Sequence, residues 1–326
     1  MLYQKKENPL VPIGNSSEEL RHYLKSVLHP HLIPKFFFET SLKDEGQLKE
    51  KRNELKIKAL DLYIRSLFSY ELIRSLSIDA PLLVIFHGFM GDKFELLEVT
   101  RPLLSNYSIL AIDLPGHGQT KIENFYSLQD VLIKIAQFIK LFSLNPAYYG
   151  YSMGGRIALQ LALHHLPPTQ LFLESAGLGL NNENEKKERL HIDQSMFAGF
   201  QQNDLGAFLE GWYNNPMFEA YKSAPTFKDD CEKKCAHDFR QWEKSQKYLS
   251  VCTFPLLSEI FKDLKNLNFP LTYIVGLNDQ KYKLIAHKLY IEKLNKIKIE
   301  EISGAGHNPH KTHPTVITSI LMKNLK

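Results

Sequence analysis

The sequence at residues 150–155 is Gly-Tyr-Ser-Met-Gly-Gly, which places a serine among glycines. It follows an apolar segment ending at Tyr149 and precedes residues 156–163, where apolar residues recur at helical spacing. A turn this tight between a strand and a helix strains the serine backbone and needs small neighbours. It exposes the Ser152 hydroxyl at the helix N-terminus, where the helix dipole favours a developing negative charge. The stretch therefore predicts a reactive serine at a strand–turn–helix corner.

The segments around this serine alternate between apolar runs and helical periodicity. Continuous apolar runs suit strands of a parallel sheet that is covered on both faces. Residues 128–142 have helical periodicity, and strands that alternate with helices predict βαβ units and a mostly parallel sheet. We expect the core strands at residues 82–86, 109–113, 147–149, 171–174, 271–275 and 297–299.

Two regions depart from this alternation. Residues 1–78 form an N-terminal extension, in which residues 16–28 predict an amphipathic helix that starts with a capping box. Residues 60–76 alternate loosely and could supply one or two leading strands. Residues 181–262 have a helical pattern rich in charges and aromatics, which predicts a helical lid over the C-terminal ends of the strands. We expect an α/β domain over residues 79–326 that includes this lid.

Composition excludes several classes of protein. The chain has 326 residues, 44% of them hydrophobic, which suffices for one large core. The net charge of +4 is spread along the sequence and does not indicate nucleic-acid binding. We find no N-terminal signal and no apolar run of the roughly 18 residues that a membrane span needs.

Cysteine usage favours a reducing, cytoplasmic compartment. The three cysteines, Cys231, Cys235 and Cys252, are too few and odd in number for a disulfide framework. Cys231 and Cys235 lie close to His237, but no second ligand pair with zinc-like spacing accompanies them. We therefore expect no metal site.

A reactive serine needs a base and an orienting acid, which follow it in the order acid, then histidine, in one large class of enzymes. Asp279 lies in the sequence Gly-Leu-Asn-Asp after one predicted strand, and His307 lies in Gly-Ala-Gly-His-Asn after the last. Both positions follow strand ends, where ligands meet an open α/β sheet. We predict that Ser152, Asp279 and His307 form a catalytic triad. His310 and His313 lack the glycine setting and are expected at the surface or in supporting positions.

The first core strand is followed by His-Gly-Phe-Met-Gly-Asp at residues 87–92. This is the usual place of an oxyanion loop, whose backbone N–H groups stabilise charge that develops on the substrate. We predict that the N–H groups of Phe89 and Met153 form the oxyanion hole. The alternative interpretation is a structural turn.

Together these motifs resemble the α/β-hydrolase fold, with a mostly parallel sheet, flanking helices and a helical lid. Within it they resemble the 2-succinyl-6-hydroxy-2,4-cyclohexadiene-1-carboxylate synthases of menaquinone biosynthesis. The most specific parts are Arg156 directly after the double glycine and the Trp-Tyr motif that begins at Trp212. The loops at residues 276–282 and 304–310 resemble the family's acid and base loops. The resemblance covers about residues 80–326.

The resemblance implies a lyase that needs no cofactor and acts in menaquinone or phylloquinone biosynthesis. It would eliminate pyruvate from 2-succinyl-5-enolpyruvyl-6-hydroxy-3-cyclohexene-1-carboxylate to give the cyclohexadiene product. Ser152 would act as a base on a substrate C–H, and guanidinium groups would bind the several carboxylates of the substrate. The implied substrate-binding residues are His87, Tyr151, Arg156, Arg189, Trp212 and Arg240.

Two other hypotheses remain open on the sequence. A serine carboxylesterase would use the same triad through an acyl-enzyme, but a neutral ester has no need of two arginines beside the serine. A non-enzymatic interaction protein, with the α/β core supporting the N-terminal arm, is disfavoured by the intact triad. We expect a small multi-carboxylate partner rather than nucleic acid or a membrane, and the sequence does not indicate an oligomeric state.

Overall fold

The computed structural model describes residues 58–77, 79–197 and 204–325. The chain divides into two units, Met1–Ser66 and Leu67–Lys326. The described residues of the first unit are helical, and the helix predicted within the N-terminal extension at residues 16–28 lies outside the described residues.

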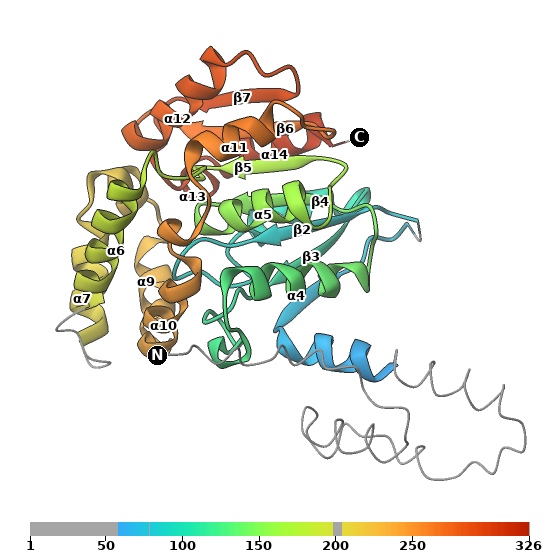
Figure 1. The fold of residues 1–326 in the computed structure, drawn as a ribbon, viewed down its shortest axis with the longest axis horizontal. Coiled ribbons are helices and arrows are strands. Elements are labelled where there is room, and N and C mark those ends of the chain that lie inside the picture. The colour runs from blue at the N-terminus through green and yellow to red at the C-terminus, as the bar shows by residue number, and fades with distance from the viewer. Residues whose placement is uncertain (1–57, 78, 198–203, 326) are drawn as a thin grey trace, which may run out of the picture. The chain divides into compact units, whose positions relative to one another are not determined.

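The second unit is built around a sheet that, in the described part of the chain, has seven strands in the order β1-β3-β2-β4-β5-β6-β7 (Figure 1). β1 runs antiparallel to β3, and the other neighbours are parallel. Strands β2 to β6 are fully buried, as expected for continuous apolar runs covered on both faces. The strands are β1 (Tyr70–Ile73), β2 (Leu82–Phe86), β3 (Ser108–Ile112), β4 (Ala147–Tyr151), β5 (Leu171–Glu174), β6 (Leu271–Gly276) and β7 (Ile297–Ile302). The predicted mostly parallel sheet is confirmed, with small differences at the strand ends.

The sheet begins earlier than the predicted domain boundary between residues 78 and 79. β1 pairs with β3 from Tyr70 opposite Ile112 to Ile73 opposite Ile109. The compact unit accordingly begins at Leu67. β1 is a partly exposed edge strand, so it lacks the continuous apolar run that marks the other strands.

Helices cover both faces of the sheet. α4 and α5 contact each other and lie in front of the sheet in Figure 1, whereas α14 lies behind it and packs on α3. No helix in the described ranges is long and apolar enough to cross a bilayer. The α-helices are α3 (Leu97–Thr100), α4 (Leu128–Lys140), α5 (Met153–His164), α6 (Glu183–Phe197), α7 (Leu205–Tyr213), α8 (Glu219–Lys222), α9 (Phe227–Cys235), α10 (Phe239–Leu249), α11 (Leu257–Leu264), α12 (Gln280–Ile291), α13 (Pro309–Thr312) and α14 (Pro314–Asn324). The 3₁₀ helices are η3 (Arg101–Ser105), η4 (Ile122–Asn124), η6 (Pro216–Phe218) and η7 (Val251–Thr253).

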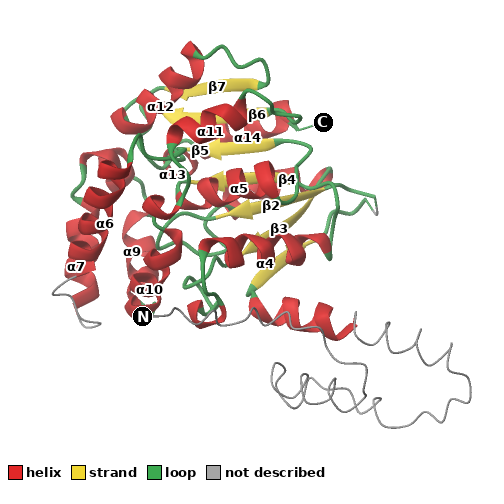
Figure 2. Ribbon diagram, viewed as in Figure 1, coloured by secondary structure: helices red, strands yellow, loops and turns green. Residues whose placement is uncertain are grey.

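Helices α6 to α11 lie between β5 and β6 in the chain, where the sequence predicts a helical lid. We call residues 183–264 the helical insertion. Figure 2 shows α6, α7, α9 and α10 beside the sheet, at the edge where the parallel strands end. The insertion has its own apolar core, which contains Phe208, Tyr221 and Trp242, and the Met90 side chain from the loop after β2 joins that core. The insertion is thereby packed against the predicted oxyanion loop.

The turn between β4 and α5 depends on glycine. Ser152 has φ +49° and ψ −108°, a conformation that L-residues rarely adopt. A Cβ atom on Gly154 would lie 2.3 Å from the Phe86 carbonyl oxygen and 2.4 Å from that of His87. Backbone oxygens of a central strand cannot move aside, so glycine is what allows α5 to approach β2.

We expect Gly154→Ala to lower the free energy of unfolding by about 1–3 kcal/mol, because the added methyl group overpacks a rigid backbone contact. Gly206→Ala is the matched control, since it lies in α7 and its Cβ would meet open space. That change should raise the free energy of unfolding by about 0.5–1 kcal/mol. Urea denaturation measures both. A Gly154→Ala protein as stable as the wild type would contradict the packing described.

Candidate active site

Ser152, Asp279 and His307 meet at the C-terminal ends of β4, β6 and β7. The Nε2 atom of His307 lies 3.0 Å from Ser152 Oγ, and its Nδ1 atom lies 2.6 Å from Asp279 Oδ2. Asp279 and His307 are buried, and Ser152 is partly exposed. The structure thus brings together the three residues predicted as a triad, at the distances that proton transfer along it requires.

Contacts on several sides orient the imidazole of His307. Asp279 is the N-cap of α12, and its Oδ1 atom accepts a hydrogen bond of 3.4 Å from the Tyr282 N–H. The Tyr282 ring lies 4.7 Å from the imidazole, centroid to centroid. The backbone N–H of His307 donates to the Met217 carbonyl at 2.9 Å. The base loop is therefore bound to the helical insertion as well as to the acid.

Burial lowers the pKa of His307 below its ordinary value, and the hydrogen bond and charge of Asp279 oppose that shift. The imidazole is therefore neutral at neutral pH. A neutral imidazole whose Nδ1–H donates to Asp279 has its Nε2 lone pair free to accept the Ser152 proton.

A pocket with a volume of about 530 Å³ lies beside Ser152, between α5, α6, α7 and the loops after β2 and β6. Phe89 and Met153 both line it. Their backbone N–H groups have no hydrogen-bond partner within the described ranges. Unpaired N–H groups beside the serine are what an oxyanion hole offers, so the geometry is compatible with the predicted role.

Arg156 reaches the pocket from the first turn of α5. One of its terminal nitrogens donates to the Leu249 carbonyl at 3.2 Å, and the guanidinium lies 5.5 Å from the centroid of the Phe254 ring. Its Nε atom is buried without a partner in the described part of the chain. Burial lowers the pKa of Arg156 to about 10, so the guanidinium stays charged at neutral pH. A charged group with an unused buried donor at a pocket wall favours an anionic ligand.

Arg189 reaches the same pocket from α6. Its Nε atom lies 2.7 Å from Oδ1 of Asp193, a buried carboxylate to which the Ser250 hydroxyl also donates. Asp193 therefore orients Arg189 and joins α6 to the segment before η7. Sequence reasoning missed Asp193, although its separation of four residues from Arg189 was a usable signal for a helical ion pair.

The structure does not bring His87 to the pocket, contrary to the predicted substrate-binding role. Its Nε2 atom accepts the Leu114 N–H at 2.9 Å, and its Nδ1 atom lies 2.7 Å from the Gly88 carbonyl oxygen. Both ring nitrogens are used by backbone groups. The buried side chain therefore joins the loops after β2 and β3 instead of facing a ligand.

Tyr151 and Arg240 also lie away from the pocket walls and need the same correction. Tyr151 is buried with its ring 4.5 Å from that of His310, and its hydroxyl accepts a hydrogen bond from the Asn308 amide at 2.7 Å. Arg240 is exposed, because α10 turns Phe239 and Trp242 inward. Neither residue belongs to the pocket lining.

Lys281 and Trp212 complete the pocket wall. Lys281, in the first turn of α12, adds a third cationic side chain. Sequence reasoning assigned it no role, although it lies two positions from Asp279. Trp212, predicted to pack on the substrate ring, has its own ring 5.4 Å from that of Phe89. The pocket thus combines aromatic and cationic groups.

His310 supports the base loop from inside the protein. It is fully buried, and its Nδ1 atom lies 2.7 Å from Oε1 of Glu174, which is also buried. The Tyr149 hydroxyl donates to the other oxygen of this carboxylate. Of the two positions considered for His310, the supporting one is the position observed.

Comparison with known proteins identifies the family of the chain. A family model described as the alpha/beta hydrolase family matches residues 83–319. The chain belongs to the alpha/beta hydrolase family. A relative from Escherichia coli named 2-succinyl-6-hydroxy-2,4-cyclohexadiene-1-carboxylate synthase is 28% identical over 252 residues, which cover 76% of this chain and 94% of the relative. A protein of Haemophilus influenzae that provisionally carries the same name is 30% identical over 240 residues, covering 70% of this chain and 90% of the relative. Within the alpha/beta hydrolases, the chain belongs with these synthases.

Solved structures of alpha/beta hydrolases confirm the fold. MenH from S. aureus superposes with a TM-score of 0.70 at 23% identity, covering 78% of this chain and 96% of that chain. The esterase EaEST from Exiguobacterium antarcticum superposes with a TM-score of 0.63 at 17% identity, covering 78% and 94%. The predicted α/β-hydrolase fold is therefore confirmed.

We expect the reactivity of Ser152 to rise with pH to a plateau, with a midpoint below about 6.5, the ordinary pKa of histidine. Only neutral His307 accepts the serine proton, and its lowered pKa means that reactivity is lost only as pH falls through that lower value. The rate at which a fluorophosphonate labels Ser152 measures the profile. Asp279→Asn should slow labelling by roughly 10⁴-fold, because the imidazole loses the correct tautomer. A midpoint above 6.5 would contradict the assignment of His307.

Proposed function

We propose that this alpha/beta hydrolase is a carbon–oxygen lyase that makes 2-succinyl-6-hydroxy-2,4-cyclohexadiene-1-carboxylate in menaquinone or phylloquinone biosynthesis. Its substrate is 2-succinyl-5-enolpyruvyl-6-hydroxy-3-cyclohexene-1-carboxylate, and pyruvate is the second product. Membership of the synthase group supports the proposal. The observation that carries it is the pair of arginines beside Ser152.

The charges of the pocket match this substrate. The ring, the succinyl group and the enolpyruvyl group each carry a carboxylate. Arg156 offers a buried donor without a partner, Arg189 is held by Asp193, and Lys281 adds a more exposed ammonium. Arginine binds carboxylates in a planar, two-pronged geometry, so the pair can fix the orientation of the ring as well as bind it.

The triad can carry the elimination by proton transfer alone. His307 takes the Ser152 proton, and the serine oxygen then removes the proton from C2 of the ring. The electrons of that C–H bond form the C2–C3 double bond, the C3–C4 double bond moves to C4–C5, and the C5–oxygen bond breaks. The departing enolpyruvate takes a proton and becomes pyruvate. The elimination involves no net oxidation or reduction, so the proposal needs no redox cofactor.

The oxyanion hole has a clear task in this reaction. The C2 position is adjacent to the succinyl ketone, so removal of its proton places negative charge on the ketone oxygen. The N–H groups of Phe89 and Met153 would donate to that oxygen. Trp212 and Phe89 offer an aromatic wall for the ring.

The alternative function is that of a serine carboxylesterase, because esterases share this fold. In that reaction Ser152 would attack a carbonyl carbon and form an acyl-enzyme. The arginine pair argues against a neutral ester as the natural substrate.

We further propose a cytoplasmic location, since all three cysteines are free thiols. The partner that we propose is the small multi-carboxylate substrate.

The first test is a spectrophotometric assay of diene formation and pyruvate release from the proposed substrate. We expect the wild type to form both, and Ser152→Ala to lose both by at least about 10³-fold because the base is missing. Circular dichroism of the variant controls for folding. A wild type that forms no diene but rapidly cleaves a p-nitrophenyl ester would replace the lyase by the esterase.

Arg156→Ala should cut kcat/KM for the multi-carboxylate substrate by about 10²-fold or more, since a buried charge-assisted hydrogen bond is lost. Cleavage of a neutral p-nitrophenyl ester should change little. Arg240→Ala tests the corrected placement of that residue and should leave both rates unchanged. Equal losses on both substrates after Arg156→Ala, or none on either, would count against the lyase.

A further inference from the structure

The predicted oxyanion donor Phe89 lies in a tight turn. The N–H of Gly91 donates to the Gly88 carbonyl at 3.1 Å, which closes a four-residue turn with Phe89 and Met90 at its centre. Met90 has φ +61°. A turn with positive φ at its third residue strongly prefers glycine there, so a methionine needs outside support to hold this conformation.

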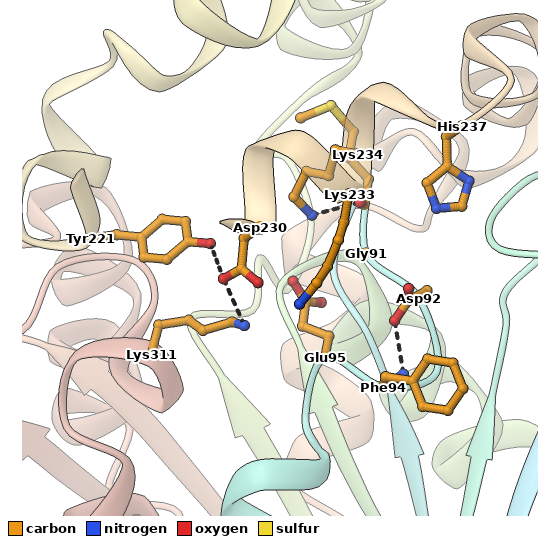
Figure 3. Close-up of a pocket in the computed structure, with 11 residues that line it drawn as sticks. Gly91, Asp92, Phe94, Glu95, Tyr221, Asp230, Lys233, Lys234, His237 and Lys311 are labelled. Carbon is orange, nitrogen blue, oxygen red and sulfur yellow. Dashed lines mark hydrogen bonds and ion pairs between the residues drawn. The ribbon is translucent and has the colours of Figure 1, made fainter. Parts of the chain in front are cut away.

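The helical insertion supplies that support at Met90. The Met90 side chain is buried in the apolar core of the insertion. Its carbonyl oxygen accepts a hydrogen bond of 2.6 Å from the Lys234 ammonium of α9. Figure 3 shows Lys234 reaching from α9 toward the loop that contains Gly91 and Asp92. Both the side chain and the carbonyl of the strained residue are therefore held by the insertion.

Glu95 holds the first residue of the same turn. Its Oε2 atom accepts the Gly88 N–H at 2.7 Å. Burial opposes ionisation of this carboxyl, yet Lys234 and other nearby cations hold the pKa of Glu95 below its ordinary value. A half-buried carboxylate thus accepts the first N–H of the turn, and an ammonium donates to its third carbonyl.

An ion pair fixes the helix that carries Lys234. Asp230, one turn earlier on α9, lies 2.9 Å from the Lys311 ammonium of α13 and accepts a hydrogen bond of 2.7 Å from the Tyr221 hydroxyl (Figure 3). α13 follows the base loop directly. α9 is therefore bound both to the loop that carries Phe89 and to the segment that follows His307.

We propose that Lys234 is a positioning residue for the oxyanion hole, which holds the Met90 carbonyl and so orients the Phe89 N–H toward the substrate oxygen. The inference rests on the proposed function, in which Phe89 is an oxyanion donor. Lys234 acts through the backbone and does not contact the substrate: it belongs to the cavity in Figure 3 and not to the pocket lining around Ser152.

The neighbouring Lys233 provides a matched control. It lies on the same helix and lines the same cavity, but it is exposed and its ammonium has no partner within the described residues. Removal of either ammonium changes the net charge of α9 equally. Only removal of the Lys234 ammonium frees the Met90 carbonyl.

The test compares Lys234→Met, Lys234→Arg and Lys233→Met in the full chain. The first readout is kcat and KM for diene formation. The second is the rate at which an uncharged fluorophosphonate labels Ser152, because its phosphoryl oxygen must enter the oxyanion hole although it has no carboxylate. Thermal unfolding reports whether each variant folds, and Lys234→Gln replaces Lys234→Met if that variant does not.

We expect Lys234→Met to lower both kcat and the labelling rate by about 10-fold, less than the roughly 10²–10³-fold loss that follows complete removal of an oxyanion donor. KM should stay within about twofold, Lys234→Arg should restore most of the rate, and Lys233→Met should match the wild type. A raised KM with normal labelling would instead show direct substrate binding and overturn the inference, as would unchanged rates in both assays. If the wild type forms no diene, the proposed function fails, while the labelling rates still decide the role of Lys234.

Discussion

The close approach of backbone to backbone at Ser152 is the constraint on which the rest of the active site depends. Gly154 packs against the carbonyl oxygens at the end of β2, and this contact holds α5 over the centre of the sheet. Because the serine is thereby forced into a positive φ, its hydroxyl projects beyond the strand ends. Asp279 and His307 lie in the loops that follow β6 and β7. Because these strands are parallel, both loops emerge at the same edge of the sheet as Ser152.

The α/β core alone does not complete the site. The insertion supplies Arg189 and Trp212, its Met217 carbonyl accepts the N–H of His307, and its core buries Met90. These contacts make the position of the helices part of the catalytic geometry. A fold shared with esterases can therefore host different reactions, because the insertion shapes the pocket while the strand ends retain the triad.

Sequence patterns predicted what depends on local chemistry. The buried strands, the glycine turn at Ser152 and the loop positions of Asp279 and His307 follow from apolar runs, glycine spacing and chain order. The loose alternation over residues 60–76 predicted a leading strand, and β1 lies there. The predicted domain boundary nevertheless falls after β1, because partial exposure removes the continuous apolar run that marks the core strands. His87, Tyr151 and Arg240 were predicted to face a ligand, but the directions of their side chains depend on tertiary contacts. The imidazole of His87 is hydrogen-bonded to backbone groups, and Tyr151 is enclosed by Asn308 and His310. Arg240 points into solvent because α10 turns its apolar face inward. The spacing of Asp193 from Arg189 is a local signal. The hydrogen bonds from Ser250 to Asp193 and from Lys234 to Met90 join residues that are distant in sequence, and no local pattern reveals them.

The triad by itself does not select between an attack on carbon and the removal of a proton. The serine oxygen, activated by His307, attacks a carbonyl carbon or removes a proton, depending on which of the two the bound substrate places next to it. Arg156 and Arg189 are fixed by Leu249 and Asp193, so carboxylates bound to them would occupy defined positions relative to Ser152. A ring held with its C2–H bond toward the serine oxygen would lose that proton instead of being attacked at a carbonyl carbon. An orientation that places the adjacent ketone in the oxyanion hole then lowers the cost of the carbanion. The arginines would therefore determine which reaction occurs by orienting the substrate, and the triad would accelerate that reaction by activating Ser152.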